Sequence, residues 1–411
     1  MKIAIVGAGV VGLACAIALA EAGHAVEILE RSSGNDAASW GNAGHIATEQ
    51  VVPLASPATL RGAVRRLYPL GGALSLPPAM MGAWLPFALR MAAASTPRAF
   101  AGGKQALSAL LADALPAWQR LGGLLGDGDL VRDSGHFVAW ETPARAAHSL
   151  AAWRATDTGT ARFDSASAGQ LAAINSLTAR PVAGAIRFSG SAQIADLGRL
   201  GTAMRNRFTQ AGGRITPCDA DLIHADGQAQ IPGVTADLIV IAGGVRSGAL
   251  VARVGHRAPI IAERGYHIRA AADRWPRDLP PIVFEDRSMI VTRYDDTVQA
   301  ASFVEFGTPD APADARKWAR LERHVAELGL PIAGPFTRWM GARPTLPDYL
   351  PAIGRSRRVD NLIYAFGHQH LGLTLAAITG EIVRHLADDI TLPFTIDSFD
   401  LERFGGRGGK A

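Results

Sequence analysis

The chain has 411 residues, of which 48% are hydrophobic and 19% are charged, so it can bury a sizeable core and is not intrinsically disordered. Its length predicts two or three domains, or one large α/β core assembled from discontinuous segments. The net charge of +4, from 41 basic and 37 acidic residues, is too small and diffuse to indicate a nucleic-acid partner.

The first thirty residues carry a dinucleotide-binding pattern. Residues 2–6 and 25–29 are short apolar runs typical of buried parallel strands, and a small-residue helix is predicted over 13–22. The helix is preceded by the sequence GAGVVG, which comprises Gly7, Ala8, Gly9, Val10, Val11 and Gly12. The glycines permit a tight turn and close approach of a pyrophosphate, and the helix N-terminus offers N–H groups to it.

Glu30 ends the second of these strands. A carboxylate there accepts hydrogen bonds from a ribose and repels a 2′-phosphate, so the pattern predicts FAD or NAD rather than NADP.

A loop rich in small and polar residues follows. It begins at Arg31 and contains SWGNAGH, in which Ser39, Asn42, Ala43 and Gly44 precede His45. Directly behind a dinucleotide βαβ unit, this loop is expected to lie over the cofactor, although an ordinary polar loop has a similar composition. His45 either faces a ligand or caps the loop, and the residues leave both interpretations open.

Residues 53–103 are rich in Ala, Leu, Pro and Gly, and residues 70–89 contain no charge. The length of this uncharged stretch approaches that of a membrane span. Its prolines (Pro77, Pro78 and Pro86) would break such a helix, so no transmembrane helix is predicted. A buried helical hairpin is slightly favoured over a patch, flanked by Arg61, Arg65 and Arg66, that rests on a membrane surface.

The middle of the chain alternates predicted helices and strands. Helices are predicted over 105–125, 144–155, 197–211 and 316–328, and strands over 135–140 and 186–194. Four strands between 264 and 306 predict an antiparallel sheet that roofs a substrate pocket.

The apolar run 236–241 ends at Ala242 and Gly243, which predicts a strand that returns to the first sheet and faces the cofactor. Ala220 is assigned to the same cofactor-facing wall. More than a hundred residues separate these nucleotide-binding elements, and this separation favours FAD over NAD.

Two motifs close the chain. One is WMGARPTLPD over 339–348, and the other is GHQHLGLT, which opens a small-residue helix. A glycine-rich turn at a helix N-terminus supplies backbone N–H hydrogen-bond donors that would stabilise an anionic reduced flavin. The residues assigned to the cofactor here are Gly367, His370, Leu371, Gly372, Leu373 and Thr374.

With these motifs in this order, the chain resembles the FAD-dependent D-amino acid oxidase superfamily, and most closely its bacterial D-amino acid dehydrogenases. The sequence ERGYH over 263–267 is similar to that of dehydrogenases acting on D-proline-type substrates, including cis-4-hydroxy-D-proline. The resemblance is weakest over 53–180.

The resemblance implies an α/β fold with two domains and a tail. A Rossmann-like FAD-binding domain is expected from residues 1–52, 185–255 and 335–395. An α+β substrate domain with an antiparallel sheet is expected from 53–184 and 256–334, and a C-terminal tail from 396–411.

The resemblance also implies roles for three residues. Arg343 matches an arginine that holds the substrate carboxylate, Tyr266 adds a phenolic hydrogen bond to it, and His45 lies beside the flavin. A planar guanidinium binds a carboxylate bidentately, which agrees with the first role. His368 and His370 are expected to be structural or to contact the flavin.

The implied activity is FAD-dependent oxidative deamination of D-amino acids by hydride transfer from the α-carbon to flavin N5, with electrons passed to a quinone or another acceptor. No cysteine follows Cys218, so non-covalent FAD is expected. Cys15 and Cys218 have no metal-ligand neighbours, no metal site is predicted, and a reducing compartment fits. The chain starts directly with a strand and not with a signal peptide, so we expect a cytoplasmic enzyme. The apolar, arginine-flanked segment leaves peripheral contact with the inner face of the cell membrane open as an alternative to a buried hairpin.

Three alternatives remain open at this point. One is an oxygen-using glycine or sarcosine-type amine oxidase. Another is a non-catalytic flavin subunit that transfers electrons within a larger complex. An NAD-dependent dehydrogenase is disfavoured by the C-terminal glycine motif. The sequence indicates neither the exact substrate nor the oligomeric state.

Overall fold

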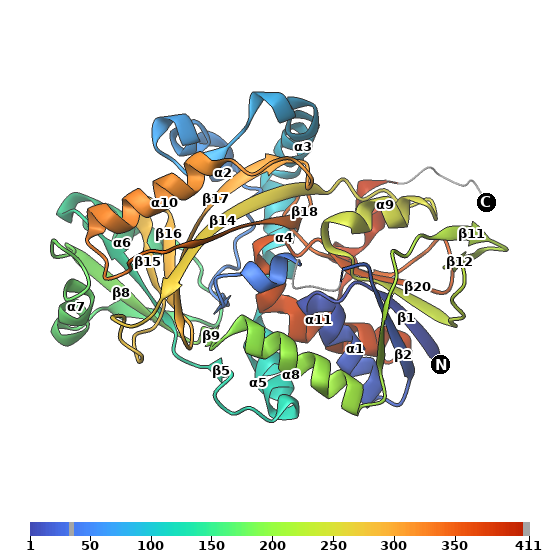
Figure 1. Cartoon of the computed structure of the whole chain (residues 1–411). Helices are drawn as coiled ribbons and strands as arrows, with labels where there is room; N and C mark the ends of the chain where they lie inside the picture. Colours follow the sequence, from blue (N-terminus) through green and yellow to red (C-terminus); the bar gives the residue numbers. More distant parts are fainter. Residues whose placement is uncertain (33–36, 406–411) are drawn as a thin grey trace.

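The computed structural model describes residues 1–32 and 37–405 and contains two principal sheets (Figure 1). The loop residues Ser33 and Gly34 and the chain end 406–411 lie outside the described residues. The first sheet has six strands in the order β10 (Arg214–Pro217), β2 (Ala25–Glu30), β1 (Lys2–Val6), β13 (Leu238–Ile241), β20 (Leu362–Phe366) and β19 (Ala352–Arg355). All neighbours are parallel except β19 and β20. The predicted α/β unit and the return of β13 beside β1 are therefore confirmed.

The central strands of this sheet are buried on both faces, as their continuous Ile, Val and Leu runs require. One face is covered by α1 (Val10–Glu21), α8 (Leu197–Gln210) and α11 (Gly372–Ala387), whose apolar residues form one core with the sheet. Helices α1 and α11 approach closely because Gly380 has no side chain, and a Cβ there would lie 2.6 Å from the Ala14 carbonyl oxygen.

The second principal sheet is mostly antiparallel. Its main path runs β18 (Thr337–Thr345), β14 (Ile261–Ala271), β17 (Thr297–Gly307), β16 (Met289–Arg293), β15 (Ile282–Phe284), β6 (His136–Trp140), β8 (Gly184–Ser189) and β7 (Arg162–Ser165), and β4 (Leu74–Ser75) joins β17. Helix α10 (Ala315–Leu328) packs against it, and α6 (Pro143–Ala155) and α7 (Ala168–Asn175) lie at its far end (Figure 1). The predicted antiparallel sheet is confirmed.

Smaller elements accompany the two principal sheets. A three-stranded sheet orders β3 (His45–Ile46), β9 (Ala192–Ile194) and β5 (Val131–Arg132). A hairpin joins β11 (Ile223–Ala225) to β12 (Gln228–Gln230), and α9 (Ser247–Ala252) follows β13.

Several predicted bounds are corrected. β8 and β18 pair within the substrate-side sheet, although 185–255 and 335–395 were assigned to the cofactor side. The strand predicted over 186–194 is divided at Gly190, whose φ of 77° favours glycine, into β8 and β9. The helix predicted over 105–125 is two helices, α4 (Pro97–Ala112) and α5 (Ala114–Leu125). The spacing of apolar residues does not show which sheet a strand joins or where one helix ends and the next begins.

Two further segments differ from their predictions. The tail expected from residue 396 is packed, because Phe399 and Leu401 are buried and short helices cover 397–399 and 401–404. The hairpin expected to be buried over 70–89 is instead at the surface, where Leu70 and Leu89 are both 65% exposed. Among the described residues, no helix is both long and apolar enough to cross a bilayer.

Candidate active site

A cavity of about 870 Å³ connects the GAGVVG turn with the substrate-side sheet. It is lined by residues from β1 and β2, from the loop over 37–50, from β14, β17 and β18, and from the start of α11. Most of the predicted site residues line it: Gly7, Gly9, Val10, Val11, Glu30, Arg31, Ser39, Asn42, Ala43, His45, Ala220, Ala242, Gly243, Tyr266, Arg343, His370, Gly372 and Leu373.

At the nucleotide end, the turn is shaped by glycine and held by Glu30. Gly7 has a φ of 108°, and a Cβ on Gly12 would lie 2.0 Å from the Gly7 carbonyl oxygen. The Glu30 Oε2 atom accepts a hydrogen bond from the Ala8 N–H at 2.6 Å. The Val10 N–H at the start of α1 donates to Ser39 Oγ at 3.1 Å, and Gly9, Val10 and Val11 line the part of the cavity where a pyrophosphate would lie.

The remaining predicted cofactor residues do not line the cavity. They are Ala8, Gly12, Gly44, Gly367, Leu371 and Thr374. Their contacts are structural: Thr374 Oγ1 accepts a hydrogen bond from the Ala47 N–H at 3.0 Å, and Gly44 packs beneath the Tyr294 ring. These residues support the cavity wall from behind the residues that line it.

Trp339 joins the cofactor loop to the substrate-side sheet. Its ring stacks on His267 at a centroid distance of 5.0 Å, and the His267 Nδ1 atom lies 3.0 Å from the Gly41 carbonyl oxygen. Cβ atoms on Gly41 or Gly341 would clash with the Trp339 ring at 2.4 and 1.8 Å, respectively. The close approach of loop and sheet therefore depends on glycine at both positions.

Arg343 projects into the cavity from β18 and is held by Glu263 on β14. Strand pairing places the two residues opposite each other, and Arg343 Nη1 donates to Glu263 Oε1 at 3.1 Å. The guanidinium lies over Gly265, where a Cβ would be 2.2 Å from Nη2. Within the part of the chain that the structure describes, Nη2 and Nε have no hydrogen-bond partner, and the side chain is 29% exposed.

Glu263 is itself a buried carboxylate with three donors. Besides Arg343, it accepts hydrogen bonds from the hydroxyls of Thr345 at 3.0 Å and Tyr349 at 3.2 Å. Burial and the neighbouring Glu263 charge raise the pKa of Tyr349 well above its usual value, so this phenol stays protonated and can donate. Glu263 therefore fixes one edge of the Arg343 guanidinium and leaves the other edge free.

The expected role of Tyr266 is not supported by its position. Its hydroxyl donates to Glu305 Oε1 at 2.8 Å and accepts from the Asp314 N–H at 3.2 Å, and the residue is 1% exposed. Glu305 also binds the buried Lys317 ammonium. Side chains alternate between the faces of a strand, so the Tyr266 hydroxyl points away from the face of β14 that carries Glu263 and pairs with Arg343, although other atoms of Tyr266 line the cavity.

The histidines of the site are mainly buried and neutral. Burial lowers the pKa of His368 to about 3 and of His370 to about 4. Both line the cavity: His368 Nε2 lies 3.0 Å from Thr379 Oγ1, and His370 Nε2 lies 2.6 Å from Gln50 Oε1. His45 also lines the cavity, where it pairs with Glu49.

A family model described as DAO: FAD dependent oxidoreductase matches residues 2–386. The chain belongs to this family. It is 28% identical to a D-amino-acid oxidase of Bradyrhizobium diazoefficiens, with 98% of each chain covered. It is 29% identical to D-amino acid dehydrogenase 2 of Pseudomonas aeruginosa, with 99% of each covered. The fold is similar to that of glycine oxidase from Geobacillus kaustophilus, with a TM-score of 0.73, 20% identity, and 98% and 99% of the two chains covered.

Membership of this family identifies the enzyme as an FAD-dependent oxidoreductase, and the residues present fit that cofactor. The glycine turn and Glu30 would hold the dinucleotide, while the loop over 37–44 and the start of α11 line the cavity further along. When bound, FAD supplies an acceptor for the substrate's electron pair.

Three polar side chains line the cavity that the sequence did not single out: Glu263, Glu49 and His136. Glu263 lies in the ERGYH segment, but its pairing with Arg343 depends on strand register across 80 residues of sequence. Glu49 follows His45 by four residues, and this spacing is a local signal for their contact. His136 gives no local signal, because it reaches the cavity from β6.

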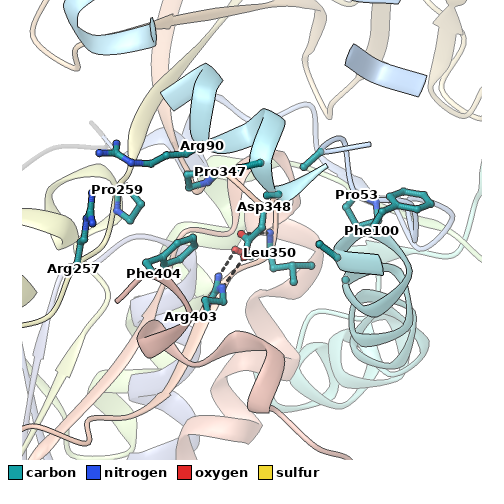
Figure 2. A pocket seen from close by; sticks show the side chains of 15 residues that line it. Pro53, Arg90, Phe100, Arg257, Pro259, Pro347, Asp348, Leu350, Arg403 and Phe404 are labelled. Carbon is teal, nitrogen blue, oxygen red and sulfur yellow. Dashed lines mark hydrogen bonds and ion pairs between the residues drawn. The ribbon is translucent and has the colours of Figure 1, made fainter. Parts of the chain in front are cut away.

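A second cavity of about 420 Å³ shares no lining residue with the first (Figure 2). It lies between α3 (Met81–Ala94), α4 and the residues that precede the chain end, and the Arg403–Asp348 ion pair, at 2.6 Å, closes one side. Arg90 and Arg257 reach it from exposed positions. It lies outside the dinucleotide cradle, and we assign no chemistry to it.

Proposed function

We propose that this enzyme oxidatively deaminates D-amino acids, with D-proline and cis-4-hydroxy-D-proline as the preferred class, and passes the electrons to a quinone or another acceptor. The observation that carries this proposal is the free edge of Arg343 in the cavity that also contains the dinucleotide cradle. Two relatives of about the same length carry D-amino acid oxidase or dehydrogenase names, which supports the substrate class. The ERGYH segment supports the cyclic substrates.

In this proposal, the residues of the chain mainly bind and orient the substrate. The substrate carboxylate accepts hydrogen bonds from Arg343 Nη2 and Nε, which form a planar fork. The neutral amine of the bound substrate permits loss of the α-hydrogen with its electron pair to the cofactor. This oxidation gives the cofactor two electrons and leaves an imine. Hydrolysis of the imine from a primary amine yields a 2-oxo acid and ammonia, whereas hydrolysis of the cyclic imine from a proline-type substrate opens the ring and releases no ammonia.

Steady-state turnover with an artificial dye acceptor tests this proposal. D- and L-enantiomers of proline, alanine, leucine and arginine are compared with cis-4-hydroxy-D-proline. The proposal predicts dye reduction and 2-oxo acid release with D-enantiomers only. Turnover of L-enantiomers alone would contradict it, and FAD-loaded protein without any turnover would favour an electron-transfer subunit.

The nature of the acceptor separates a dehydrogenase from a glycine or sarcosine-type oxidase. The relatives are divided on this point, since one carries an oxidase name and others carry dehydrogenase names. We propose a dehydrogenase. Turnover in air without dye should then release hydrogen peroxide at a small fraction of the dye-supported rate, whereas equal rates would favour the oxidase.

We also propose that the FAD is held without a covalent bond. Cys15 is buried in α1, and Cys218 lies beside the Glu30 strand, where its N–H donates to the Glu30 carbonyl at 2.9 Å. This position belongs to the ribose end of the cradle, away from the flavin ring. Acid precipitation should leave the yellow cofactor in the supernatant, and a coloured pellet would contradict this proposal.

The acceptor is proposed to be reached at a membrane surface. Six of the ten exposed large hydrophobic side chains of the described residues lie within 60–89: Leu60, Val64, Leu70, Met81, Leu85 and Leu89. Four exposed arginines flank them (Arg61, Arg65, Arg66 and Arg90), and residues 50–112 contain no acidic residue. This surface includes α2 (Pro57–Gly62) and α3 at the top of Figure 1, and Ala73 of the same segment lines the large cavity. Apolar side chains with arginines suit an anionic bilayer.

Co-sedimentation with phospholipid vesicles tests this surface. The chain should bind vesicles that contain phosphatidylglycerol better than neutral ones, and Leu89→Glu should weaken binding severalfold. Leu124→Glu is the matched control, because Leu124 is 46% exposed on α5, at the opposite side of Figure 1. Equal binding by both variants, or no binding by the unmodified chain, would contradict the proposal.

A further inference from the structure

Three side chains with metal-ligand chemistry converge at one wall of the large cavity. His45 comes from β3, Glu49 follows it by four residues, and His136 opens β6. His45 Nε2 lies 3.2 Å from Glu49 Oε1, and the His45 and His136 rings meet edge to face at a centroid distance of 4.4 Å. One donor atom from each residue lies within 4.8 Å of the other two.

Two atoms of this cluster are buried without a hydrogen-bond partner. They are His45 Nδ1 and Glu49 Oε2, and the two side chains are only 8% and 3% exposed. Leaving a buried polar group unpaired is unfavourable, and more so for a charged group. Glu49 therefore has unused ligand capacity.

His136 is held in place by neighbours outside the cluster. Its Nδ1 lies 3.0 Å from the hydroxyl of the buried Ser191, and its ring stacks on Phe188 at 4.5 Å with an interplanar angle of 6°. A hydrogen bond at one ring nitrogen holds the ring in its orientation and leaves the other nitrogen available as a metal ligand. Metal-binding histidines are oriented in this way.

We propose that His45, Glu49 and His136 bind a divalent transition-metal ion of the zinc type. Two imidazoles and a carboxylate are a common zinc ligand set, and zinc bonds to nitrogen and oxygen are about 2.0–2.2 Å long. The 3.2 Å between His45 Nε2 and Glu49 Oε1 suits two ligands of one ion. A fourth position faces the cavity and is filled by water or by a ligand. The site does not depend on the proposed substrate.

Metal content and zinc titration of the FAD-loaded enzyme test this site. After chelator treatment, calorimetric titration with Zn²⁺ should show close to one equivalent bound. Glu49→Gln keeps the shape of the side chain, removes its charge, and should weaken binding by about tenfold or more. His148→Gln is the matched control, since His148 is an exposed histidine on α6 and should bind zinc like the unmodified chain.

Ser191→Ala provides a second variant that retains all three ligands. It removes the hydrogen bond to His136 and should weaken zinc binding less than Glu49→Gln does. Circular dichroism and flavin absorbance show that each variant is folded. The proposal is overturned if the unmodified enzyme binds no stoichiometric zinc, or if Glu49→Gln and His148→Gln bind zinc equally. If Glu49→Gln does not fold, the unmodified enzyme and Ser191→Ala decide the question.

Discussion

Replacement of Arg343 by alanine removes the group proposed to bind the substrate carboxylate. Two free guanidinium nitrogens, Nη2 and Nε, can each donate a charged hydrogen bond. Such bonds contribute about 1.5–3 kcal/mol each, so two together amount to about 3–6 kcal/mol. At about 1.4 kcal/mol per tenfold change, kcat/KM should fall by about 10²- to 10⁴-fold.

The fold should survive this change, because Glu263 keeps the hydroxyls of Thr345 and Tyr349 as donors. Dye-coupled turnover measures kcat/KM, and flavin absorbance per chain shows whether the cofactor is retained. Arg343→Lys keeps the charge without the planar fork and should fall between the alanine variant and the unmodified enzyme. Arg257→Ala, beside the second cavity, is the control and should leave kcat/KM unchanged. A fall of less than about tenfold for Arg343→Ala would refute the reasoning.

Three further predictions concern the cofactor cradle, acid stability and thiol reactivity. Gly12→Val should abolish FAD retention, because a Cβ at Gly12 would lie 2.0 Å from a backbone oxygen. Gly102→Val is the control and should retain FAD, because the space around Gly102 is open. Flavin absorbance per chain distinguishes the two variants. Burial lowers the pKa of His368 to about 3, below the value of about 6.5 in the unfolded chain. Between these two values the unfolded chain binds one proton more than the folded chain, so the free energy of unfolding falls by about 1.4 kcal/mol for each pH unit of acidification. His368→Gln should lessen this slope by one proton between pH 6 and 4.5 in urea unfolding, and an unchanged slope would count against it. Burial raises the pKa of the Cys15 thiol to about 12, so iodoacetamide should label only Cys218 in the native protein. Because Cys218 lines the large cavity, bound FAD should slow its labelling. Rapid labelling of Cys15 would contradict this prediction.

The parts predictable from sequence are those that depend on neighbouring residues. The GAGVVG turn, its flanking strands and Glu30 occupy a continuous stretch, and their geometry follows from strand, turn and helix preferences. The glycine motif before α11 is local in the same sense. The return of β13 to β1 was also predictable, because a fully apolar strand with a glycine turn fits a parallel sheet.

The parts that could not be predicted depend on long-range register. Tyr266 was placed with Arg343, but β14 pairs with β18 so that Glu263, rather than Tyr266, shares the face of Arg343. The register between β14 and β17 also shifts near Arg264, where Phe303 has a φ of 72° and its carbonyl accepts a hydrogen bond from Arg343 at 3.4 Å. Neither the pairing nor this irregularity leaves a local pattern. Glu49 and His136 also come together through long-range packing, which leaves no local pattern in the sequence.

Anaerobic titration of the FAD-loaded enzyme with single amino acids tests the central claim most directly. Enzyme absorbance in the oxidised-flavin band is followed as each D- or L-amino acid, including cis-4-hydroxy-D-proline, is added without any acceptor. The account predicts that D-enantiomers bleach the band and L-enantiomers do not, and that Arg343→Ala needs far more substrate for the same bleaching. A flavin that no D-amino acid reduces, or that L-enantiomers reduce equally well, would contradict it.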